Sequence, residues 1–200
     1  MTDIFEERSK DYDANDMIKL LSSAIGRCII KNVELNGQMQ VLDFGAGTGL
    51  ISSQIAPYVK KITAVDISQS MLDKLIAKQE HTDKIQALCQ DITIDPIGTK
   101  YDLIMSAMAM HHVEDIDNLL KRFSEHLKSG AKIALADLDK EDGSFHPKEM
   151  EDVYHEGFER RRLQSTLEKH GFKNVNFETA HTINGETRPY PIFLVLATKT

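Results

Sequence analysis

A glycine-rich run is the part of this sequence whose residue types and spacing most clearly could do chemistry. Within residues 41–50, an apolar strand leads into Asp43, then into glycines at the alternate positions 45, 47 and 49, and then into the start of a helix. Glycine turns tightly at positive φ and lets the backbone come close to a ligand. A helix that begins directly after such a turn offers free N–H groups. The run therefore predicts a cradle for a small molecule.

The spacing of these glycines indicates what the cradle could hold. A dinucleotide fingerprint is Gly-x-Gly-x-x-Gly, in which the glycines seat a pyrophosphate. Here Leu50 stands where the third glycine of that fingerprint would be, and Asp43 lies two positions before the first glycine. A carboxylate at that place would repel a pyrophosphate but suits a ligand with an ammonium or sulfonium group. A nicotinamide-dependent oxidoreductase therefore remains only as a disfavoured alternative.

Two further acids follow predicted strands. Asp66 ends the apolar run 61–66, and Asp91 comes shortly after the run 85–89. Because ligands of parallel α/β sheets bind outside the carboxyl ends of the strands, we expect Asp43, Asp66 and Asp91 to lie close together.

Alternating strands and helices must position these side chains. Strands are predicted over 39–44, 61–66, 85–89, 101–105 and 131–138, with two late strands over 175–179 and 192–198 joined by a turn at 184–185. Helices are predicted from residue 15 or 16, over 50–58, from 68 or 69, from 115 or 117 to a glycine cap at 129–130, and over 157–170. This pattern predicts a doubly wound α/β fold with helices on both faces of a mostly parallel sheet and an antiparallel addition at one edge.

Composition limits the classes of protein to which the chain can belong. With 200 residues and 41% hydrophobic content, we expect one domain over residues 1–200 with a sizeable core. The net charge of -7 argues against a nucleic-acid partner. Two cysteines, Cys28 and Cys89, favour a reducing compartment, and no run is apolar and long enough for a membrane span or a signal peptide. We therefore expect a cytoplasmic monomer or homodimer.

Five motifs together resemble those of class I S-adenosylmethionine-dependent methyltransferases, in particular the small UbiE-like or type 11/12 group. They are the glycine run, an acid motif at the second strand, a segment around Asp91, the fourth strand with its loop, and a turn before the fifth strand: 41–50, 62–68, 89–92, 101–115 and 127–131. The resemblance implies a seven-stranded sheet in the order 3-2-1-4-5-7-6, with the last strand antiparallel. It also implies S-adenosylmethionine as the cofactor.

The resemblance assigns cofactor contacts to the glycine run and to residues that follow strands: Asp43, Gly45, Ala46, Gly47, Thr48, Asp66, Ile67, Met71, Asp91, Ile92 and Ser106. The glycine run would pass under the methionyl part, and Asp43 would order that run and favour the cationic end. Asp66 would accept from both ribose hydroxyls. Ile67 and Met71 would pack on the adenine, while Asp91 and the Ile92 N–H would bond its edge. Ser106 would lie beside the methionyl group or the methyl group.

The implied reaction is an in-line displacement at a sulfonium methyl, with a small molecule as the acceptor. Alignment can supply most of the catalysis, and a general base is needed only if the nucleophile must lose a proton. His111 and His112 follow the fourth strand and are the candidate bases. Tyr12, His146 and His155 are candidates for the substrate cavity, which a helical cap over residues 1–35 and the segment 140–156 would cover.

Two other interpretations of the chain follow from its residues. A protein of this fold could bind the cofactor as a regulator without catalysis, because the chemistry demands no particular catalytic residue. A metal site could use acids and histidines between Asp137 and His155, but their spacing matches no compact metal motif, so no metal is expected.

Overall fold

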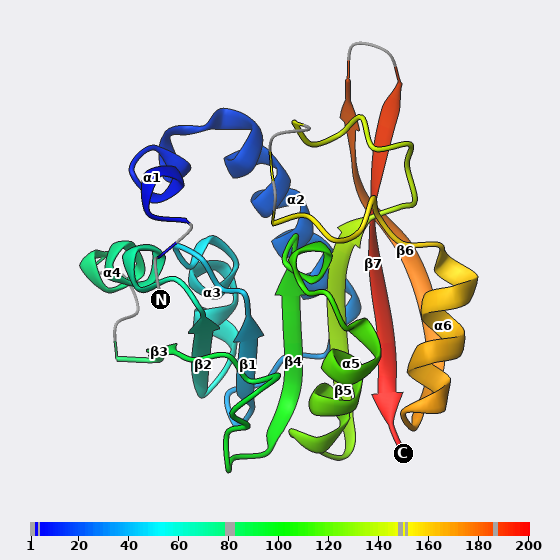
Figure 1. The fold of residues 1–200 in the computed structure, drawn as a ribbon. Coiled ribbons are helices and arrows are strands. Elements are labelled where there is room, and N and C mark those ends of the chain that lie inside the picture. The colour runs from blue at the N-terminus through cyan, green and yellow to red at the C-terminus, as the bar shows by residue number, and fades with distance from the viewer. Residues whose placement is uncertain (1–2, 4, 79–82, 148–149, 151, 186–187) are drawn as a thin grey trace.

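Seven strands form one sheet in the order β3-β2-β1-β4-β5-β7-β6. The computed structural model describes the chain apart from residues 1–2, 4, 79–82, 148–149, 151 and 186–187 (Figure 1). The strands are β1 (Gln40–Phe44), β2 (Lys61–Asp66), β3 (Ile85–Cys89), β4 (Tyr101–Ala107), β5 (Leu127–Leu138), β6 (Phe172–Asn184) and β7 (Pro189–Lys199). Neighbours pair in parallel except around β7, which is antiparallel to both β5 and β6. The predicted fold and strand order are confirmed.

Helices cover both faces of this sheet. They are α1 (Glu6–Ser9), α2 (Asp16–Asn32), α3 (Leu50–Ile55), α4 (Gln69–Ala77), α5 (Ile116–Glu125) and α6 (Arg160–Lys169), with 3₁₀ turns η1 (Tyr12–Ala14), η2 (Ala56–Tyr58) and η3 (Met110–His112). Side-chain caps fix where α2 and α4 begin, because Asn15 accepts from the N–H groups of Met17 and Ile18, and Ser68 accepts from that of Met71. Among the residues described, none of the helices is apolar over a length that would cross a membrane.

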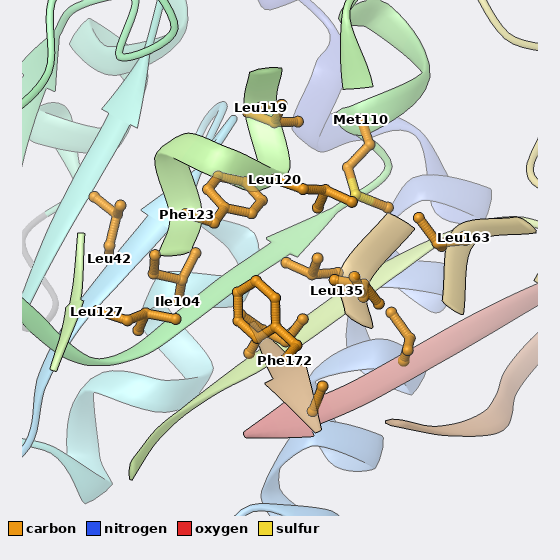
Figure 2. Packing of buried hydrophobic residues seen from close by; sticks show 14 of the residues in the cluster. Leu42, Ile104, Met110, Leu119, Leu120, Phe123, Leu127, Leu135, Leu163 and Phe172 are labelled. Carbon is orange, nitrogen blue, oxygen red and sulfur yellow. The ribbon is translucent and has the colours of Figure 1, made fainter. Parts of the chain in front are cut away.

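Two hydrophobic clusters lie on opposite faces of the sheet, because successive strand residues point to opposite sides. Leu42 and Ile104 pack with α5 and α6, whereas their neighbours Val41 and Leu103 pack with α2 and α3. Figure 2 shows the first cluster, in which the Phe123 ring lies near Leu120 and Ile104. Both faces of the central strands are therefore buried, which leaves only their ends for a ligand.

Several predicted element boundaries were wrong, and α3, predicted over 50–58, ends at Ile55. The helix predicted to reach a cap at 129–130 ends at Glu125, and β5 already begins at Leu127. Leu127 pairs with Tyr101, but the next pair of the register joins Lys132 to Leu103, so Gly130 at φ +77° belongs to an irregular stretch of the strand. The helix predicted over 157–170 begins at Arg160, because Glu159 caps it.

The two late strands are longer than predicted. They cover 172–184 and 189–199, and their pairing continues to Asn184 opposite Pro189. The extension was missed because β6 carries exposed polar side chains without a clear apolar alternation. In Figure 1 this hairpin projects past the carboxyl ends of the central strands, beside the segment that joins β5 to α6.

Candidate active site

The glycine run forms a tight loop at the carboxyl end of β1. Gly45, Gly47 and Gly49 have φ values of +64°, +54° and +78°, a region that L side chains rarely adopt. A side chain on Gly45 would collide with Cβ of Ala109, so only glycine fits there. A Cβ built on Gly47 would meet nothing within 4 Å, because this point faces open space. The loop therefore brings bare backbone to the edge of a cavity, as its spacing predicted.

Asp66 ties this loop to the end of β2. Its Oδ2 accepts from the Gly47 N–H at 2.7 Å, and its Oδ1 accepts from the Ser68 N–H at 2.9 Å. Burial is the largest influence and raises the pKa of Asp66, although these backbone donors oppose it. Each carboxylate oxygen has a second lone pair. Asp66 can therefore accept two further hydrogen bonds from a ligand.

Asp66 lines a cavity of about 430 Å³ at the ends of β1, β2 and β4, which we call the acidic cavity because Asp66, Asp91, Glu114 and Asp115 lie around it. Ile67 is 56% exposed and Met71 is buried, and both line this cavity. Asp91 lines it too, while its Oδ1 accepts from the backbone and hydroxyl of Thr93 at 2.9 and 2.6 Å. The cavity thus joins carboxylates to an apolar wall.

A second cavity of about 790 Å³ adjoins the first and is called the apolar cavity. Its walls are mainly apolar side chains of α2, the start of α3, the loop after β4, the β5–α6 segment and the β6–β7 hairpin: Met17, Ile18, Leu21, Ile25, Leu50, Ile51, Met108, Phe145, Pro147, Met150, Ile183 and Tyr190. Ala46, Thr48 and Asp43 also line it. Among the described residues that line it there is no lysine or arginine.

The two cavities share one wall. Six residues line both: Tyr12, Gly45, Gly47, Ala107, Met108 and His112. Met108 has φ +55°, a strained conformation for a residue with a side chain, and such strain tends to occur at functional sites. A group bound in one cavity can therefore meet a group bound in the other at this shared wall.

Asp43 is fully buried at the edge of the apolar cavity. Its Oδ2 accepts from the Ser52 hydroxyl at 2.6 Å. Burial, assisted by the negative charge of Asp66, raises the pKa of Asp43 to about 7. A positive charge nearby would lower this pKa again. A cationic ligand beside Asp43 stays a prediction of the sequence.

His111 forms a buried pair with Asp137. Nδ1 of His111 lies 2.7 Å from Oδ1 of Asp137, and the His111 backbone N–H donates to Oδ2 at 3.3 Å. An ionised carboxylate only accepts, so Nδ1 carries the proton and Nε2 is left for a ligand. Burial acts to lower the pKa of His111, but the charge and hydrogen bond of Asp137 outweigh it, and the pKa is raised.

The pKa of His112 is shifted in the opposite direction to that of His111. Its Nδ1 lies 2.6 Å from the backbone oxygen of Asp152. A carbonyl only accepts, so Nδ1 carries the proton and Nε2 of the neutral ring has a free electron pair. Burial, followed by the positive charge of His111, lowers the pKa of His112. His112 is therefore an unprotonated base at neutral pH, at the wall that both cavities share.

His146 completes a cluster of three imidazoles on the apolar cavity. Its ring centroid lies 4.9 Å from that of His111 and 6.2 Å from that of His112. Burial and then the charges of the two other rings lower the pKa of His146 to about 4, so it is neutral at physiological pH. Among the residues described, these side chains form no group of three or more ligands that could hold a metal ion.

The N-terminal segment lies against these residues. Asp13 accepts from the Thr48 hydroxyl at 2.5 Å and pairs with Lys78 at 2.7 Å. Asp3 accepts from the Ser68 hydroxyl at 2.9 Å and from the Ser70 N–H at 3.0 Å. The Phe5 ring meets the His112 ring edge-on with centroids 5.5 Å apart. The segment before α2 is thus attached to the elements that carry both cavities.

Two predicted site residues lie elsewhere than expected, and for a third, Ile92, the expected contact is that of its backbone. Ser106 is fully buried and its hydroxyl donates to the Phe44 carbonyl at 2.9 Å, so it lines neither cavity. His155 lines a separate outer groove, because its Nε2 bonds the Val113 carbonyl at 2.9 Å. The Ile92 side chain is buried in the core, so its backbone N–H alone could serve a ligand.

Asp137 is a site residue that sequence reasoning weighed only as a metal ligand. It stands near the carboxyl end of β5, beside β4 in the sheet, as Asp43 and Asp66 stand near the ends of their strands. The same strand-end argument would therefore have placed it beside His111. The strained Met108 and the Asp152 carbonyl leave no signal in the sequence.

Comparisons with known proteins agree with this geometry. A family model described as a methyltransferase domain matches residues 14–176. An uncharacterised methyltransferase of Schizosaccharomyces pombe is 29% identical over 202 residues, which is 90% of this chain and 69% of that protein. A ubiquinone biosynthesis O-methyltransferase of Coxiella burnetii is 31% identical over 115 residues, which is 56% of this chain and 48% of that protein. The chain therefore spans only about half of the latter relative.

Solved structures share the fold at low identity. A SAM-dependent methyltransferase from Aquifex aeolicus has a TM-score of 0.73 and 20% identity, and the match covers 98% of each chain. A Haemonchus contortus phosphoethanolamine N-methyltransferase in complex with S-adenosyl-L-methionine has a TM-score of 0.72 and 16% identity over 98% of this chain and 59% of that chain. The chain belongs to the methyltransferase domain family and shares the fold of these S-adenosylmethionine-dependent methyltransferases.

Proposed function

We propose that this enzyme transfers the methyl group of S-adenosylmethionine to an oxygen atom of a small, mainly apolar organic acceptor, with His112 as the general base. The observation that carries the proposal is the position of His112, whose neutral ring lies on the one wall common to the acidic and apolar cavities. The cofactor would occupy the acidic cavity and the glycine loop, and the acceptor would occupy the apolar cavity.

The residues around the acidic cavity fit the cofactor. Asp66 has free lone pairs for the two ribose hydroxyls, and Met71 and Ile67 offer an apolar surface to the adenine. Asp91 and the Ile92 N–H would bond the adenine edge, and the glycine loop with Ala46 and Thr48 would pass beside the methionyl part. The bound cofactor supplies an electrophilic methyl group on a positively charged sulfur.

The protein's part in the reaction is alignment and proton removal. A nucleophile at the shared wall would approach the methyl group from the side opposite the sulfur, as an in-line displacement requires. His112 would accept the proton of the acceptor hydroxyl on Nε2, while the Asp152 carbonyl holds the proton on Nδ1. Such general-base help is worth about 10²–10⁴-fold in rate. His111 carries the higher pKa of the pair and could stabilise the oxygen as its charge develops.

Oxygen is favoured as the accepting atom for two reasons. A hydroxyl needs a base to become a good nucleophile, and this wall offers a neutral imidazole. The Coxiella burnetii relative is named an O-methyltransferase, and so is a malonyl-[acyl-carrier protein] relative of Priestia megaterium, 28% identical over 132 residues.

We also propose that residues 1–35 form a cap over the acceptor. Tyr12 lies on the wall that both cavities share, and α2 supplies one side of the apolar cavity. The contacts of Asp3 and Asp13 with Ser68, Thr48 and Lys78 support a closed position of this cap.

Titrations and a transfer assay test the proposal. S-adenosylhomocysteine should bind the purified protein and NADH should not, as followed by fluorescence. Incubation with S-adenosylmethionine and apolar phenols, followed by mass spectrometry, should give methylated products, and His112→Ala should slow their formation. Tight cofactor binding without transfer to any hydroxyl acceptor would favour the non-catalytic regulator instead.

A further inference from the structure

One buried nitrogen of the apolar cavity lacks a partner. Among the described residues, Nε2 of His146 is the side-chain nitrogen that is shielded from solvent and makes no hydrogen bond. Leaving such a group unsatisfied costs free energy, because the nitrogen has given up water without a replacement. A buried polar atom without a partner in a folded protein calls for an explanation, and a functional role is one such explanation.

The segment that carries His146 is held firmly by its neighbours. The carboxylate of Glu141, itself buried, accepts from the N–H groups of Ser144 and Phe145 at 2.8 and 3.2 Å. The Ser144 hydroxyl bonds the Tyr190 hydroxyl at 2.7 Å, and the Phe145 and Tyr190 rings meet with centroids 5.2 Å apart. The β6–β7 hairpin thus positions His146 while its Nε2 stays unpaired.

The charges around the apolar cavity restrict what can fill it. Asp43 and the three histidines are the ionisable side chains of its described lining apart from tyrosines. No lysine or arginine among those residues could balance a phosphate or carboxylate. Asp43 lines this cavity at the glycine loop, and its carboxylate could balance only a positive charge. Among the described lining, a phosphate or carboxylate would therefore meet only histidines, of which His111 is already paired with Asp137, so its desolvation would be poorly compensated.

We infer that His146 binds a second polar group of the acceptor, close to the oxygen that receives the methyl group, and that the remainder of the acceptor is apolar and carries no phosphate or carboxylate. The inference deepens the proposed function and rests on its placement of the acceptor in the apolar cavity. His146 lines the cavity, and its ring would have to turn about the Cβ–Cγ bond to offer the shielded Nε2 to a ligand. The neutral imidazole can donate from one nitrogen or accept at the other, so a hydroxyl suits either tautomer.

This role has a consequence that a structural role would not have. Replacing His146 by phenylalanine removes an unpaired polar atom and keeps a ring of similar shape. The ligand-free variant should therefore melt about 2–4 °C higher than the wild type. A histidine that stabilises the fold would give a lower melting temperature instead. Gain of stability together with loss of acceptor recognition would mark His146 as a specificity residue.

The test compares two probes on protein saturated with S-adenosylhomocysteine. One is para-hexylphenol, and the other is its ortho-hydroxymethyl derivative, which adds a neighbouring hydroxyl. Calorimetric titration should show the derivative binding wild type about tenfold more tightly, as one good hydrogen bond predicts. His146→Phe should lose this preference, and His146→Asn should keep part of it. His170→Phe is the matched control, because His170 bonds Asp117, lines neither cavity and should not affect either probe.

Several results would overturn the inference. They are an absence of preference in the wild type, a preference retained in His146→Phe, a lower melting temperature or failure to fold of that variant, or no binding of either phenol. Methyl transfer is measured separately as the product released from S-adenosylmethionine. If the preference depends on His146 but neither phenol is methylated, the proposed reaction fails while this inference stands. If both phenols are methylated equally well by the wild type and the variant, the reaction stands and this inference fails.

Discussion

Replacing Asp43 by asparagine tests whether this buried acid at the glycine loop destabilises the protein when it is ionised and no cationic ligand is bound. Asp43 is 2% exposed and accepts one hydrogen bond from Ser52. Its pKa is raised from 3.8 to about 7, chiefly by burial. The unfolded chain ionises this carboxyl near pH 4, whereas the folded protein without ligand ionises it only near pH 7. Ionised Asp43 is therefore a destabilising feature of the ligand-free enzyme.

The size and sign of the effect follow from this shift. A difference of about three pKa units corresponds to about 4 kcal/mol of unfolding free energy, as an upper figure. The contribution of protonated Asp43 to the unfolding free energy is fully present below about pH 4. It is lost as the pH rises through 7, because the unfolded chain releases this proton at a lower pH than the folded protein does. Asp43→Asn cannot ionise. Its unfolding free energy, relative to wild type, should rise by up to about 4 kcal/mol between pH 4 and pH 8.

Urea unfolding of both proteins without cofactor, at several pH values, measures this difference directly. Taking the difference between variant and wild type cancels the contributions of titrating groups that do not interact with Asp43. Ser52→Ala is a second probe. Without the Ser52 hydroxyl, the pH at which the unfolding free energy falls should lie higher than in the wild type, because this hydrogen bond lowers the pKa of Asp43. S-adenosylmethionine should in turn bind wild type more tightly at pH 8 than at pH 6, and Asp43→Asn should show little such dependence. Parallel unfolding curves for variant and wild type would refute the reasoning.

Three further substitutions probe the cofactor contacts, the base and the core. Asp66→Ala should weaken S-adenosylhomocysteine binding by about 10- to 100-fold in calorimetry, because charged hydrogen bonds are lost, and an unchanged affinity would contradict the assignment. His112→Ala should lower kcat by about 10²–10⁴-fold, with cofactor affinity changed far less. Since the pKa of His112 is lowered, wild-type activity should fall only below about pH 6.5, and His112→Ala should lack that decline; an unchanged kcat would exclude His112 as the base. Phe123→Ala, in the cluster of Figure 2, should cost about 3–5 kcal/mol in urea unfolding, and a loss under about 1 kcal/mol would show that α5 does not anchor that face.

The fold could be predicted from the sequence because each central strand is apolar and is followed by a helix pattern. Apolar residues at successive positions, such as Val41 and Leu42, predict burial on both faces, and the structure divides them between two clusters. The boundaries failed where local signals competed. Gly130 resembled a helix cap, but pairing of Leu127 with Tyr101 ended α5 earlier and left Gly130 within the strand. Tertiary pairing outweighed the local glycine signal there.

For the candidate site, too, some features could be predicted from the sequence and others could not. Residues that follow strands in the parallel sheet could be expected to meet, and Asp66 reaches the glycine loop as a hydrogen-bond acceptor. Ser106 also lies near the end of a strand, but its hydroxyl donates to the Phe44 carbonyl and does not reach either cavity. Position along the chain predicted proximity to the site, whereas the direction of one side chain depended on the sheet register, in which Ser106 pairs with Phe44.

The two histidines between β5 and α6 mark the point at which sequence no longer predicts the site. His146 lines the apolar cavity, because the nearby Ser144 hydroxyl bonds Tyr190 of β7 and holds that part of the segment against the hairpin. His155 lines the outer groove instead, because its Nε2 bonds the Val113 carbonyl. Each direction is set by a partner distant along the chain, and neither follows from a periodicity of the irregular segment itself. The sequence named both histidines as candidates without telling which one lines the apolar cavity, and the unpaired Nε2 of His146 is evident only in the folded chain.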